Sequence, residues 1–454
     1  MSDATTMVIF GASGDLTSRL LLPALGQLLT IEPDREVRLF GAGVDDWDDE
    51  RWRTTVRRAF DEMNADAAYD RVKDTTYHKL DITDPSELTS LFAMVGPAPA
   101  LYFAVPPAIA AASCEAMTKI DLPEGTVIAL EKPFGTSQAS AHELNEVLAK
   151  LLPENQVFRV DHFLGRSMTL NVLGVRFANR VLEPVWKGEH IESILICYDE
   201  QLGLEGRARY YDKAGALRDM IQSHLLQVMA VVAMEPPATL SEQDLRDATT
   251  AALRATHVWN DDPITSSRRG RYTAGTIDGR QLPSYTEEHG VVPENNTETL
   301  AEVTFEVATE RWAGVPITLR SGKAIGAPRR HIQLRFKPVR HVPTGFTGST
   351  DGTTLTFELG PDRMSLELNM NDGGDEFELR KESLSADLGA GALKAYAEVL
   401  QGILDGDATL SVRGDAAEQC WRIVQPVLDA WAKNEVPLQD YAAGSAGPEG
   451  WADN

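Results

Sequence analysis

The first 160 residues alternate short apolar runs with longer stretches of helical character, and few architectures accommodate that order. The apolar runs predict strands at residues 7–10, 37–41, 76–82, 100–105, 126–130 and 157–160. The stretches between them predict helices at residues 15–30, 47–64, 85–95, 107–120 and 137–152. Because a helix is the usual connection between parallel strands, this part of the chain is predicted to form a Rossmann-like, doubly wound sheet.

A different pattern begins near Val160. Strand-like segments then follow one another without helical spacers, as at residues 300–307, 331–338, 355–359 and 364–370. This pattern favours a large, mainly antiparallel sheet, accompanied by a helix at 215–234 and by helices toward the C-terminus. The predicted fold is therefore α/β followed by α+β, with one domain at 1–160 and a second at 161–454.

The chain is acidic, with 68 Asp and Glu against 43 Lys and Arg and a formal net charge of −25. Nucleic acids are poor partners for such a chain, because binding their phosphates needs a basic face. No apolar run reaches the roughly 18 residues of a membrane span, and the N-terminus lacks a signal-type stretch. Cys114, Cys197 and Cys420 show neither metal-ligand nor disulfide spacing. These features predict a cytoplasmic protein without a membrane anchor or a bound metal.

A glycine-containing turn joins the first predicted strand to the first predicted helix. Gly11 and Gly14 allow a tight turn and a close approach of the backbone to a pyrophosphate, and the helix start offers N–H groups to the anion. Many such turns hold two glycines without a ligand, but this one follows the first strand of an alternating series. The residues expected to bind a dinucleotide here are Gly11, Ala12, Ser13, Gly14, Asp15 and Leu16.

The end of the second predicted strand bears on the choice between NAD and NADP. Val44 has no charge, and Asp45 and Asp46 would repel a 2′-phosphate, which favours NAD. Alternatively, both aspartates only cap the helix that begins near Trp47, and a neighbouring arginine contacts a 2′-phosphate. The arginines considered for this contact are Arg19, Arg51 and Arg53. The cofactor contacts expected at these strand ends are Val44, Asp45, Asp81 and Ile82.

Scarce basic residues gather where predicted strands end, which is where ligands bind in sheets of this kind. Lys132 follows the strand at 126–130 and precedes Pro133, which stiffens the chain. Asp161, His162 and Arg166 follow the strand at 157–160. A lone lysine is usually a solvated surface residue, but a carboxylate, an imidazole and two cations at neighbouring strand ends indicate a ligand site.

A helix is predicted from Gly215, and its apolar stripe includes Leu217, Ile221 and Val228. His224 lies on the same stripe. One interpretation is a hydrogen-bonded core histidine, which is the commoner case for a single residue. The other is a general base that a nearby carboxylate orients.

Taken together, these motifs resemble the glucose-6-phosphate dehydrogenase family along nearly the whole chain. The matching segments are residues 11–16, 131–135, 159–165, 205–207, 218–219, 222–227, 233–235, 319–324, 444–445 and 447–448. Their order resembles that of the family, as does the spacing between the lysine motif and the two histidine motifs. Such a set is far more specific than any single motif.

By this resemblance, His224 removes the proton from the hydroxyl at carbon 1 of glucose 6-phosphate, and Asp161 orients the imidazole. Hydride from the same carbon passes to NAD(P)⁺ and leaves 6-phosphoglucono-lactone. The resemblance assigns substrate binding to His162, Arg166, Lys132, Glu200, Asp219, Lys323 and Arg329, with Lys132 also near the nicotinamide. It further implies NADP as the usual cofactor, and a homodimer or homotetramer formed through the large sheet of the second domain.

The chain departs from the family pattern at several positions. Phe163 stands where the family has tyrosine, and Arg166 and Ser167 stand where it has lysine and glutamate. Arginine keeps the positive charge and can bind phosphate through two hydrogen bonds, so phosphate recognition is expected to survive. Val44 replaces the arginine expected for NADP, and Pro328 replaces a basic residue.

Two other hypotheses stay open. Phe163 and Pro328 are compatible with a related dehydrogenase that acts on another sugar phosphate. The second hypothesis is a paralogue that senses a sugar phosphate or a nucleotide without turnover. The second hypothesis is disfavoured because a protein without catalytic activity need not keep the candidate site residues, which are Lys132, Asp161, His162 and His224.

Overall fold

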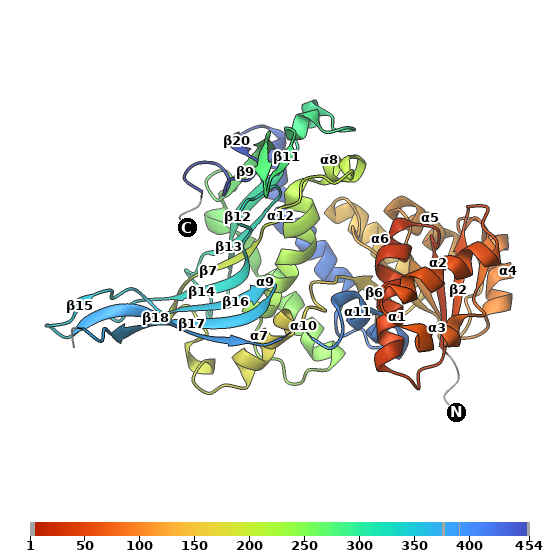
Figure 1. Ribbon diagram of the computed structural model, residues 1–454, viewed down its shortest axis with the longest axis horizontal. Coiled ribbons are helices and arrows are strands. Elements are labelled where there is room, and N and C mark those ends of the chain that lie inside the picture. Colours follow the sequence, from red (N-terminus) through yellow and green to blue (C-terminus); the bar gives the residue numbers. More distant parts are fainter. Residues whose placement is uncertain (1–4, 375–376, 390, 452–454) are drawn as a thin grey trace. The chain divides into compact units, whose positions relative to one another are not determined.

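The computed structural model describes residues 5–374, 377–389 and 391–451 (Figure 1). They form two compact units, each built from separated stretches of the chain. The first unit consists of the described residues up to Arg166 together with 237–250 and 391–419. The second consists of the described residues within 167–236, 251–390 and 420–454. No helix in the described ranges is long and apolar enough to cross a membrane.

The first unit contains the predicted doubly wound sheet. Its strands are β1 (Thr5–Phe10), β2 (Val37–Gly43), β3 (Thr76–Lys79), β4 (Pro99–Phe103), β5 (Val127–Leu130), β6 (Val157–Val160) and β19 (Ser411–Val412). The strand order is β19-β6-β5-β4-β1-β2-β3, and every pairing is parallel except that of β19 with β6. This order confirms the Rossmann-like prediction.

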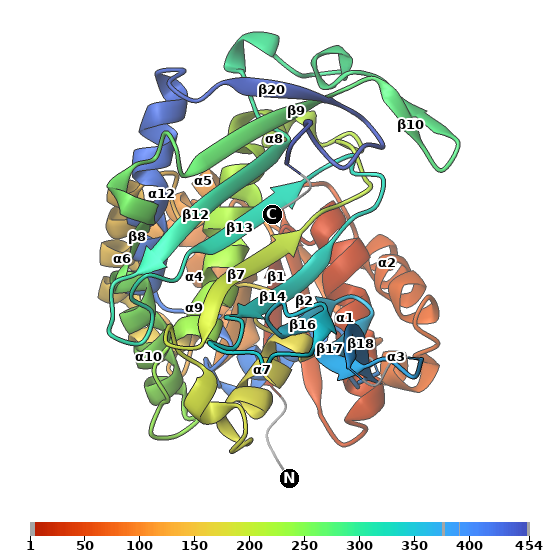
Figure 2. The ribbon, with the colours of Figure 1, turned by 90° about the vertical axis from the view of Figure 1, so that its left-hand side faces the viewer.

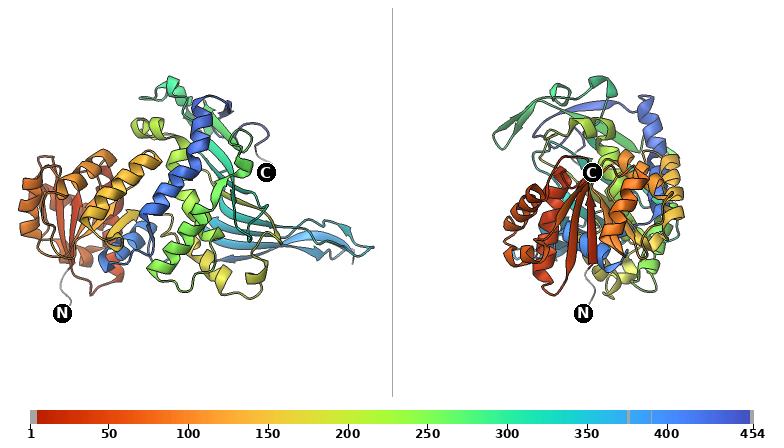
Figure 3. Two further views of the ribbon diagram at one scale, coloured as in Figure 1. Left: turned by 180° about the vertical axis from the view of Figure 1, so that it is seen from behind. Right: turned by 90° about the vertical axis from the view of Figure 1, so that its right-hand side faces the viewer.

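Both faces of this sheet are buried, as a parallel sheet requires. Met7 and Ile9 of β1 join one apolar cluster, while Val8 and Phe10 join another on the opposite face. The helices of the unit are η1 (Thr17–Leu21), α1 (Leu22–Ile31), α2 (Asp49–Asp61), α3 (Asp66–Val72), α4 (Pro85–Val95), α5 (Pro107–Met117), α6 (Gln138–Leu151), η2 (Glu154–Gln156) and α11 (Ala395–Asp405). The right-hand view of Figure 3 shows helices on both sides of the sheet.

Two predicted elements differ in detail from the structure. The helix predicted at 47–64 is shorter in the structure: α2 ends at Asp61, and Asn64 adopts the left-handed conformation with a φ of 54° before a separate helix, α3, begins at Asp66. Asparagine tolerates this conformation better than most residues. The strand predicted at 76–82 ends at Lys79, so Asp81 and Ile82 lie in the loop that follows β3.

The second unit is built around the predicted large sheet. Its strands are β7 (Ile191–Tyr198), β8 (Thr256–Val258), β9 (Ser267–Thr273), β10 (Gly275–Ile277), β11 (Arg280–Leu282), β12 (Leu300–Val307), β13 (Ile317–Gly322), β14 (Arg330–Phe336), β15 (Thr347–Gly348), β16 (Thr354–Leu359), β17 (Asp362–Asn371), β18 (Glu378–Asp387) and β20 (Leu438–Ala442). The main order is β15-β18-β17-β16-β14-β7-β13-β12-β9-β20, with β8 beside β12 and with β10 and β11 as a separate pair. Most pairings are antiparallel, as predicted, but β7 with β13, β9 with β20 and β15 with β18 run parallel.

The two faces of this sheet have opposite character. One row of neighbours across the strands is apolar, and it runs through Phe305, Ile317, Ile194, Leu334, Leu355, Leu366 and Leu384. The adjacent row faces the other way and runs through Thr304, Thr318, Leu195, Gln333, Thr356, Ser365 and Ser385. Figure 2 shows strands β12, β13, β7 and β14 in front of helix α9.

The helices of the second unit include the one predicted at 215–234. These helices are α7 (Ser167–Phe177), η3 (Glu183–Val185), α8 (Ala208–Ala216), η4 (Leu217–Leu225), α9 (Leu226–Ala233), η5 (Trp259–Asp261), η6 (Tyr285–Glu287) and η7 (Pro293–Asn295). Two more, α10 (Glu242–Arg254) and α12 (Gly414–Ala432), contain residues of both units. Gly215 has a φ of 66° and kinks the chain before η4, which has π-helical hydrogen bonding. A Cβ at Gly215 would lie 2.3 Å from the Glu298 Oε1 atom, so a larger residue does not fit there.

Candidate functional site

The glycine turn after β1 has the geometry that a pyrophosphate requires. Gly11 has a φ of 80°, and a Cβ on it would lie only 2.3 Å from the carbonyl oxygen of Ala104. The N–H groups of Gly11 and Ala12 donate to the carbonyl of Ala42, at 2.9 and 3.1 Å. The first N–H groups of the helix that follows have no acceptor within the helix. These groups, together with a backbone free of bulky side chains, fit the phosphates of a dinucleotide.

The end of β2 is tied to this turn. The Ser13 hydroxyl donates a hydrogen bond to the Asp45 carboxylate, and the Tyr77 hydroxyl donates to the Asp45 carbonyl at 3.2 Å. Asp46 instead forms an exposed ion pair with Lys79 at 2.9 Å. The side chain of Asp48 caps α2, so the capping alternative for Asp45 and Asp46 is wrong. The structure thus brings two predicted cofactor residues, Ser13 and Asp45, into direct contact.

The arginines considered as partners of a 2′-phosphate have different surroundings. The Arg53 Nε atom donates to the Thr75 carbonyl at 2.9 Å, and Arg19 pairs with Asp15 at 3.2 Å. The guanidinium of Arg51 lies 4.4 Å from the centre of the Trp47 ring. Among the three, Arg51 has the surroundings most compatible with an additional anion.

Two further predicted cofactor residues lie after β3. The Asp81 carboxylate accepts hydrogen bonds from the hydroxyl and the N–H of Thr83, at 2.7 and 2.9 Å. These bonds lower the pKa of Asp81. Ile82 is buried in the core below the sheet edge. Asp81 therefore stabilises the loop that follows β3, and the buried side chain of Ile82 anchors this loop to the core.

Lys132 follows β5 and is joined to Pro133 by a cis peptide bond. Its neighbour Glu131 accepts a hydrogen bond from the Tyr102 hydroxyl at 2.5 Å and is also bonded to Tyr396. Burial raises the pKa of Glu131, and the tyrosine bonds oppose that shift. The sequence did not point to either tyrosine, because neither lies in a motif that signals chemistry.

Asp161, His162 and Arg166 lie in the loop after β6. The buried Asp161 carboxylate accepts a hydrogen bond from the N–H of Phe163 at 2.9 Å. The His162 ring stacks on Tyr396, with 5.4 Å between ring centres and 13° between ring planes. The guanidinium of Arg166 lies 4.4 Å from the centre of the Phe163 ring. Phe163 thus supports Arg166 through a cation–π contact, although it lacks a hydroxyl.

In the second unit, Glu200, Lys323 and Arg329 gather at one edge of the large sheet. Glu200 follows β7 and Lys323 follows β13; because these strands run parallel, their ends meet at the same edge. The Lys323 Nζ atom lies 2.6 Å from the Glu200 Oε2 atom and 5.1 Å from the centre of the Tyr211 ring. Arg329 precedes β14 and lies 3.8 Å from the buried carboxylate of Asp199. Predicted substrate residues far apart in the sequence are therefore neighbours here.

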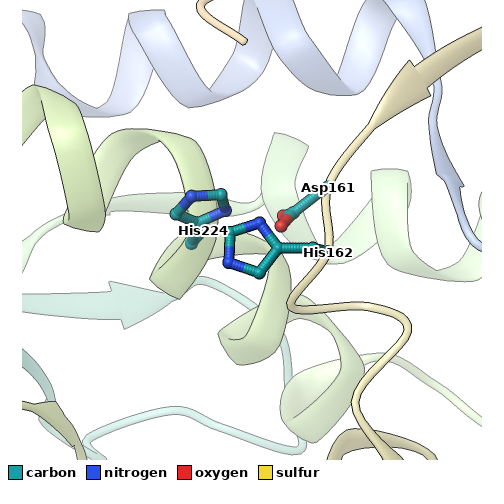
Figure 4. A group of neighbouring side chains, drawn as sticks. All are labelled: Asp161, His162 and His224. Carbon is teal, nitrogen blue, oxygen red and sulfur yellow. The ribbon is translucent and has the colours of Figure 1, made fainter. Parts of the chain in front are cut away.

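Asp219 and His224 lie on η4. The Tyr210 hydroxyl donates to the Asp219 Oδ1 atom at 3.0 Å. His224 is buried, with 1% of its surface exposed. Figure 4 shows its imidazole on the helical segment, and it shows Asp161 and His162 on the chain that leaves β6.

Comparison with known proteins agrees with these motifs. The family model "Glucose-6-phosphate dehydrogenase, NAD binding domain" matches residues 8–171, and that of the C-terminal domain matches residues 173–453. The chain belongs to the glucose-6-phosphate dehydrogenase family. This confirms the resemblance, and it confirms an NAD(P)-binding domain in the N-terminal part of this family member.

Relatives of the chain match over nearly their whole length. Glucose-6-phosphate 1-dehydrogenase of Gluconobacter oxydans is 38% identical, covering 97% of this chain and 94% of the relative. A crystal structure of the Mycobacterium avium enzyme has a TM-score of 0.86 at 34% identity, covering 98% and 95% of the two chains. A glucose-6-phosphate dehydrogenase in complex with glucose 6-phosphate has a TM-score of 0.87 at 28% identity, covering 98% and 96%.

Proposed function

We propose that this protein oxidises D-glucose 6-phosphate at carbon 1 to 6-phosphoglucono-lactone and transfers the hydride to NAD(P)⁺, the reaction that opens the pentose phosphate pathway. The observation that carries this proposal is the family match over residues 8–171 and 173–453. The glycine turn supports cofactor binding by the first unit. The cluster of Glu200, Lys323 and Arg329 supports substrate binding by the second.

His224 acts as the general base in this proposal. Its imidazole takes the proton from the carbon 1 hydroxyl while a hydride passes from the same carbon to the nicotinamide cofactor. The Asp161 carboxylate orients the imidazole and stabilises its charged form. The Phe163 N–H holds that carboxylate in place. A base of this kind contributes about 10²–10⁴-fold to the rate.

The remaining predicted residues bind the sugar phosphate. His162 and Arg166 hold the phosphate, and each is supported by an aromatic ring, Tyr396 and Phe163 respectively. Lys132 lies between the sugar and the nicotinamide. The sugar hydroxyls and the phosphate end contact Glu200, Asp219, Lys323 and Arg329.

Turnover is the direct test of this function. The purified protein is assayed by the absorbance of reduced nicotinamide, with glucose 6-phosphate and with a panel of other hexose and amino-sugar phosphates. We expect glucose 6-phosphate to give the highest kcat/KM. A higher kcat/KM with another sugar phosphate would replace the proposed substrate, and binding without turnover of any of them would favour the sensing paralogue.

For the cofactor, we propose that NAD is preferred to NADP. Asp45 is held at the phosphate turn by Ser13, where its negative charge opposes a 2′-phosphate, and Val44 is 68% exposed and offers no cation. Arg51 is the residue that allows some use of NADP.

The Val44→Arg variant is expected to raise kcat/KM for NADP about 10-fold, because a charge-assisted hydrogen bond to phosphate contributes about 1.5–3 kcal/mol. Its kcat/KM for NAD should change much less. Parallel initial-rate series with both cofactors measure this ratio. Equal efficiencies with NAD and NADP in the unmodified protein would contradict the proposed preference.

We also propose a homodimer or homotetramer whose subunits contact one another through the large sheet. The row that contains Thr318, Leu195 and Gln333 is half-buried in the single chain and faces away from the apolar row. Sedimentation velocity is expected to give a dimer or tetramer for the unmodified protein and smaller species for Leu195→Arg. Leu384→Arg, at an exposed leucine of the opposite face, is the matched control and should keep the assembly. A monomeric unmodified protein would contradict this proposal.

A further inference from the structure

The C-terminal motif at residues 444–448 lies against the segment that carries Lys323. The Gly444 N–H donates to the Ala324 carbonyl at 2.8 Å, and the Gly326 N–H donates to the Ser445 carbonyl at 3.0 Å. A Cβ on Gly326 would lie 2.0 Å from the Gly444 carbonyl oxygen. The two backbones are therefore in direct contact, and neither leaves room for a larger residue at Gly326.

Tyr441, at the end of β20 just before this motif, contacts Lys323 itself. Its hydroxyl donates to the Lys323 carbonyl at 2.7 Å and shares a second hydrogen bond with the Thr299 hydroxyl at 2.8 Å. The Lys323 N–H donates to the Thr299 carbonyl at 2.8 Å. Both backbone polar groups of Lys323 are thus fixed by Tyr441 and Thr299. Burial raises the pKa of Tyr441, so its hydroxyl remains a donor at neutral pH.

The same segment sets the position of Glu200. The Glu200 N–H donates to the Gly322 carbonyl at 2.7 Å, and the Ile325 N–H donates to the Glu200 carbonyl at 3.0 Å. Ala324, between them, adopts the left-handed conformation with a φ of 55°, which a non-glycine residue keeps only when its surroundings impose it. The backbone next to the ion pair of Lys323 and Glu200 therefore has an unfavourable conformation at Ala324, and hydrogen bonds from the C-terminal segment hold it there.

We propose that Tyr441 is a positioning residue that orients Lys323 and, through it, Glu200 for the sugar phosphate. This inference rests on the proposed function, because it assigns Tyr441 to the same substrate site. Tyr441 is buried, and in this proposal it acts through the carbonyl of Lys323.

Tyr441→Phe removes the hydroxyl and keeps the ring. We expect the KM for glucose 6-phosphate to rise about 5-fold, in line with the loss of one hydrogen bond, while the KM for the cofactor stays within a factor of 2. Tyr272→Phe is the matched control. Tyr272 is buried in β9 directly opposite Tyr441, and its hydroxyl donates to Glu288 at 3.1 Å. We expect both KM values of this control to equal those of the unmodified protein.

A double-mutant cycle separates positioning from general destabilisation. In a Lys323→Met background, Tyr441→Phe should change the KM for glucose 6-phosphate by less than a factor of 2, because the side chain through which Tyr441 acts is absent. A further 5-fold rise in that background would overturn the inference. Equal KM changes in Tyr441→Phe and Tyr272→Phe would overturn it as well.

Amide hydrogen exchange tests the inference independently of turnover. Peptides that contain residues 320–327 should exchange about 5-fold faster in Tyr441→Phe than in the unmodified protein, and the Tyr272→Phe control should leave them unchanged. Exchange at an unchanged rate in Tyr441→Phe would overturn the positioning role. Failure of the unmodified protein to turn over glucose 6-phosphate would contradict the proposed function alone, and the exchange rates would still decide whether Tyr441 holds the Lys323 segment.

Discussion

Replacing His224 with asparagine is expected to lower kcat for glucose 6-phosphate oxidation by about 10²–10⁴-fold, with KM values close to those of the unmodified protein. Asparagine keeps a polar side chain of similar reach on η4 but cannot take a proton from the carbon 1 hydroxyl. Because His224 is buried, a thermal melt must accompany the assay to show that the variant is folded. Stopped-flow measurement of the first turnover then assigns the loss to the chemical step.

His190→Asn is the control for this experiment. His190 belongs to the same unit, and its side chain is partly exposed beside Glu189. We expect kcat of this control to match that of the unmodified protein. A kcat for His224→Asn within 10-fold of that of the unmodified protein would exclude His224 as the base. The alternative interpretation, a hydrogen-bonded core histidine, would then hold.

The first sheet was predictable because its strands are local patterns. Each apolar run is bounded by a turn, and helices between the runs require a parallel order. The β19 strand was not predictable in this way. It is two residues long and pairs with β6 across about 250 residues of chain, so no local periodicity marks it. The sequence did not indicate Tyr396 for the same reason, because Tyr396 belongs to segment 391–419, which is part of the first unit but lies far from the rest of it in the sequence.

The site was predictable where a residue type at a strand end implies its chemistry. Lys132 and Asp161 were expected just after predicted strands, and the structure places them after β5 and β6. Lys323 was assigned only through the family resemblance, and the structure places it directly after β13. The sequence could not choose the cap of α2, because Asp45, Asp46 and Asp48 have the same intrinsic preference for the position. Asp48 remains as the cap because Asp45 contacts Ser13 and Asp46 contacts Lys79, and these tertiary contacts are not visible in the sequence.

Substituting Gly11 with alanine is expected to weaken cofactor binding by about 100-fold or more, the second of the two largest effects. The left-handed conformation at Gly11 costs an alanine about 1–2 kcal/mol. The added Cβ would also clash with the Ala104 carbonyl oxygen, which would lie only 2.3 Å away. Because that oxygen belongs to the backbone, the clash can be relieved only if the turn moves away from the end of β4. That movement displaces the N–H groups that the pyrophosphate needs. Calorimetric titration with NAD measures the change.

Alanine substitutions at two other glycines distinguish the conformational cost at Gly11 from the steric clash of its added Cβ. Gly96 has nearly the same φ, 79°, but a Cβ on it would meet no heavy atom within 4 Å. Gly96→Ala should therefore lower the melting temperature by a few degrees through the conformational cost alone and leave the Kd for NAD unchanged. At Gly14 a Cβ would lie 3.1 Å from the Gly11 carbonyl oxygen, with no left-handed φ to add to the cost. Gly14→Ala should give an intermediate loss, because a shift of a few tenths of an ångström relieves its contact. A folded Gly11→Ala variant that binds NAD as tightly as Gly96→Ala does would show that the turn after β1 is not where the pyrophosphate binds.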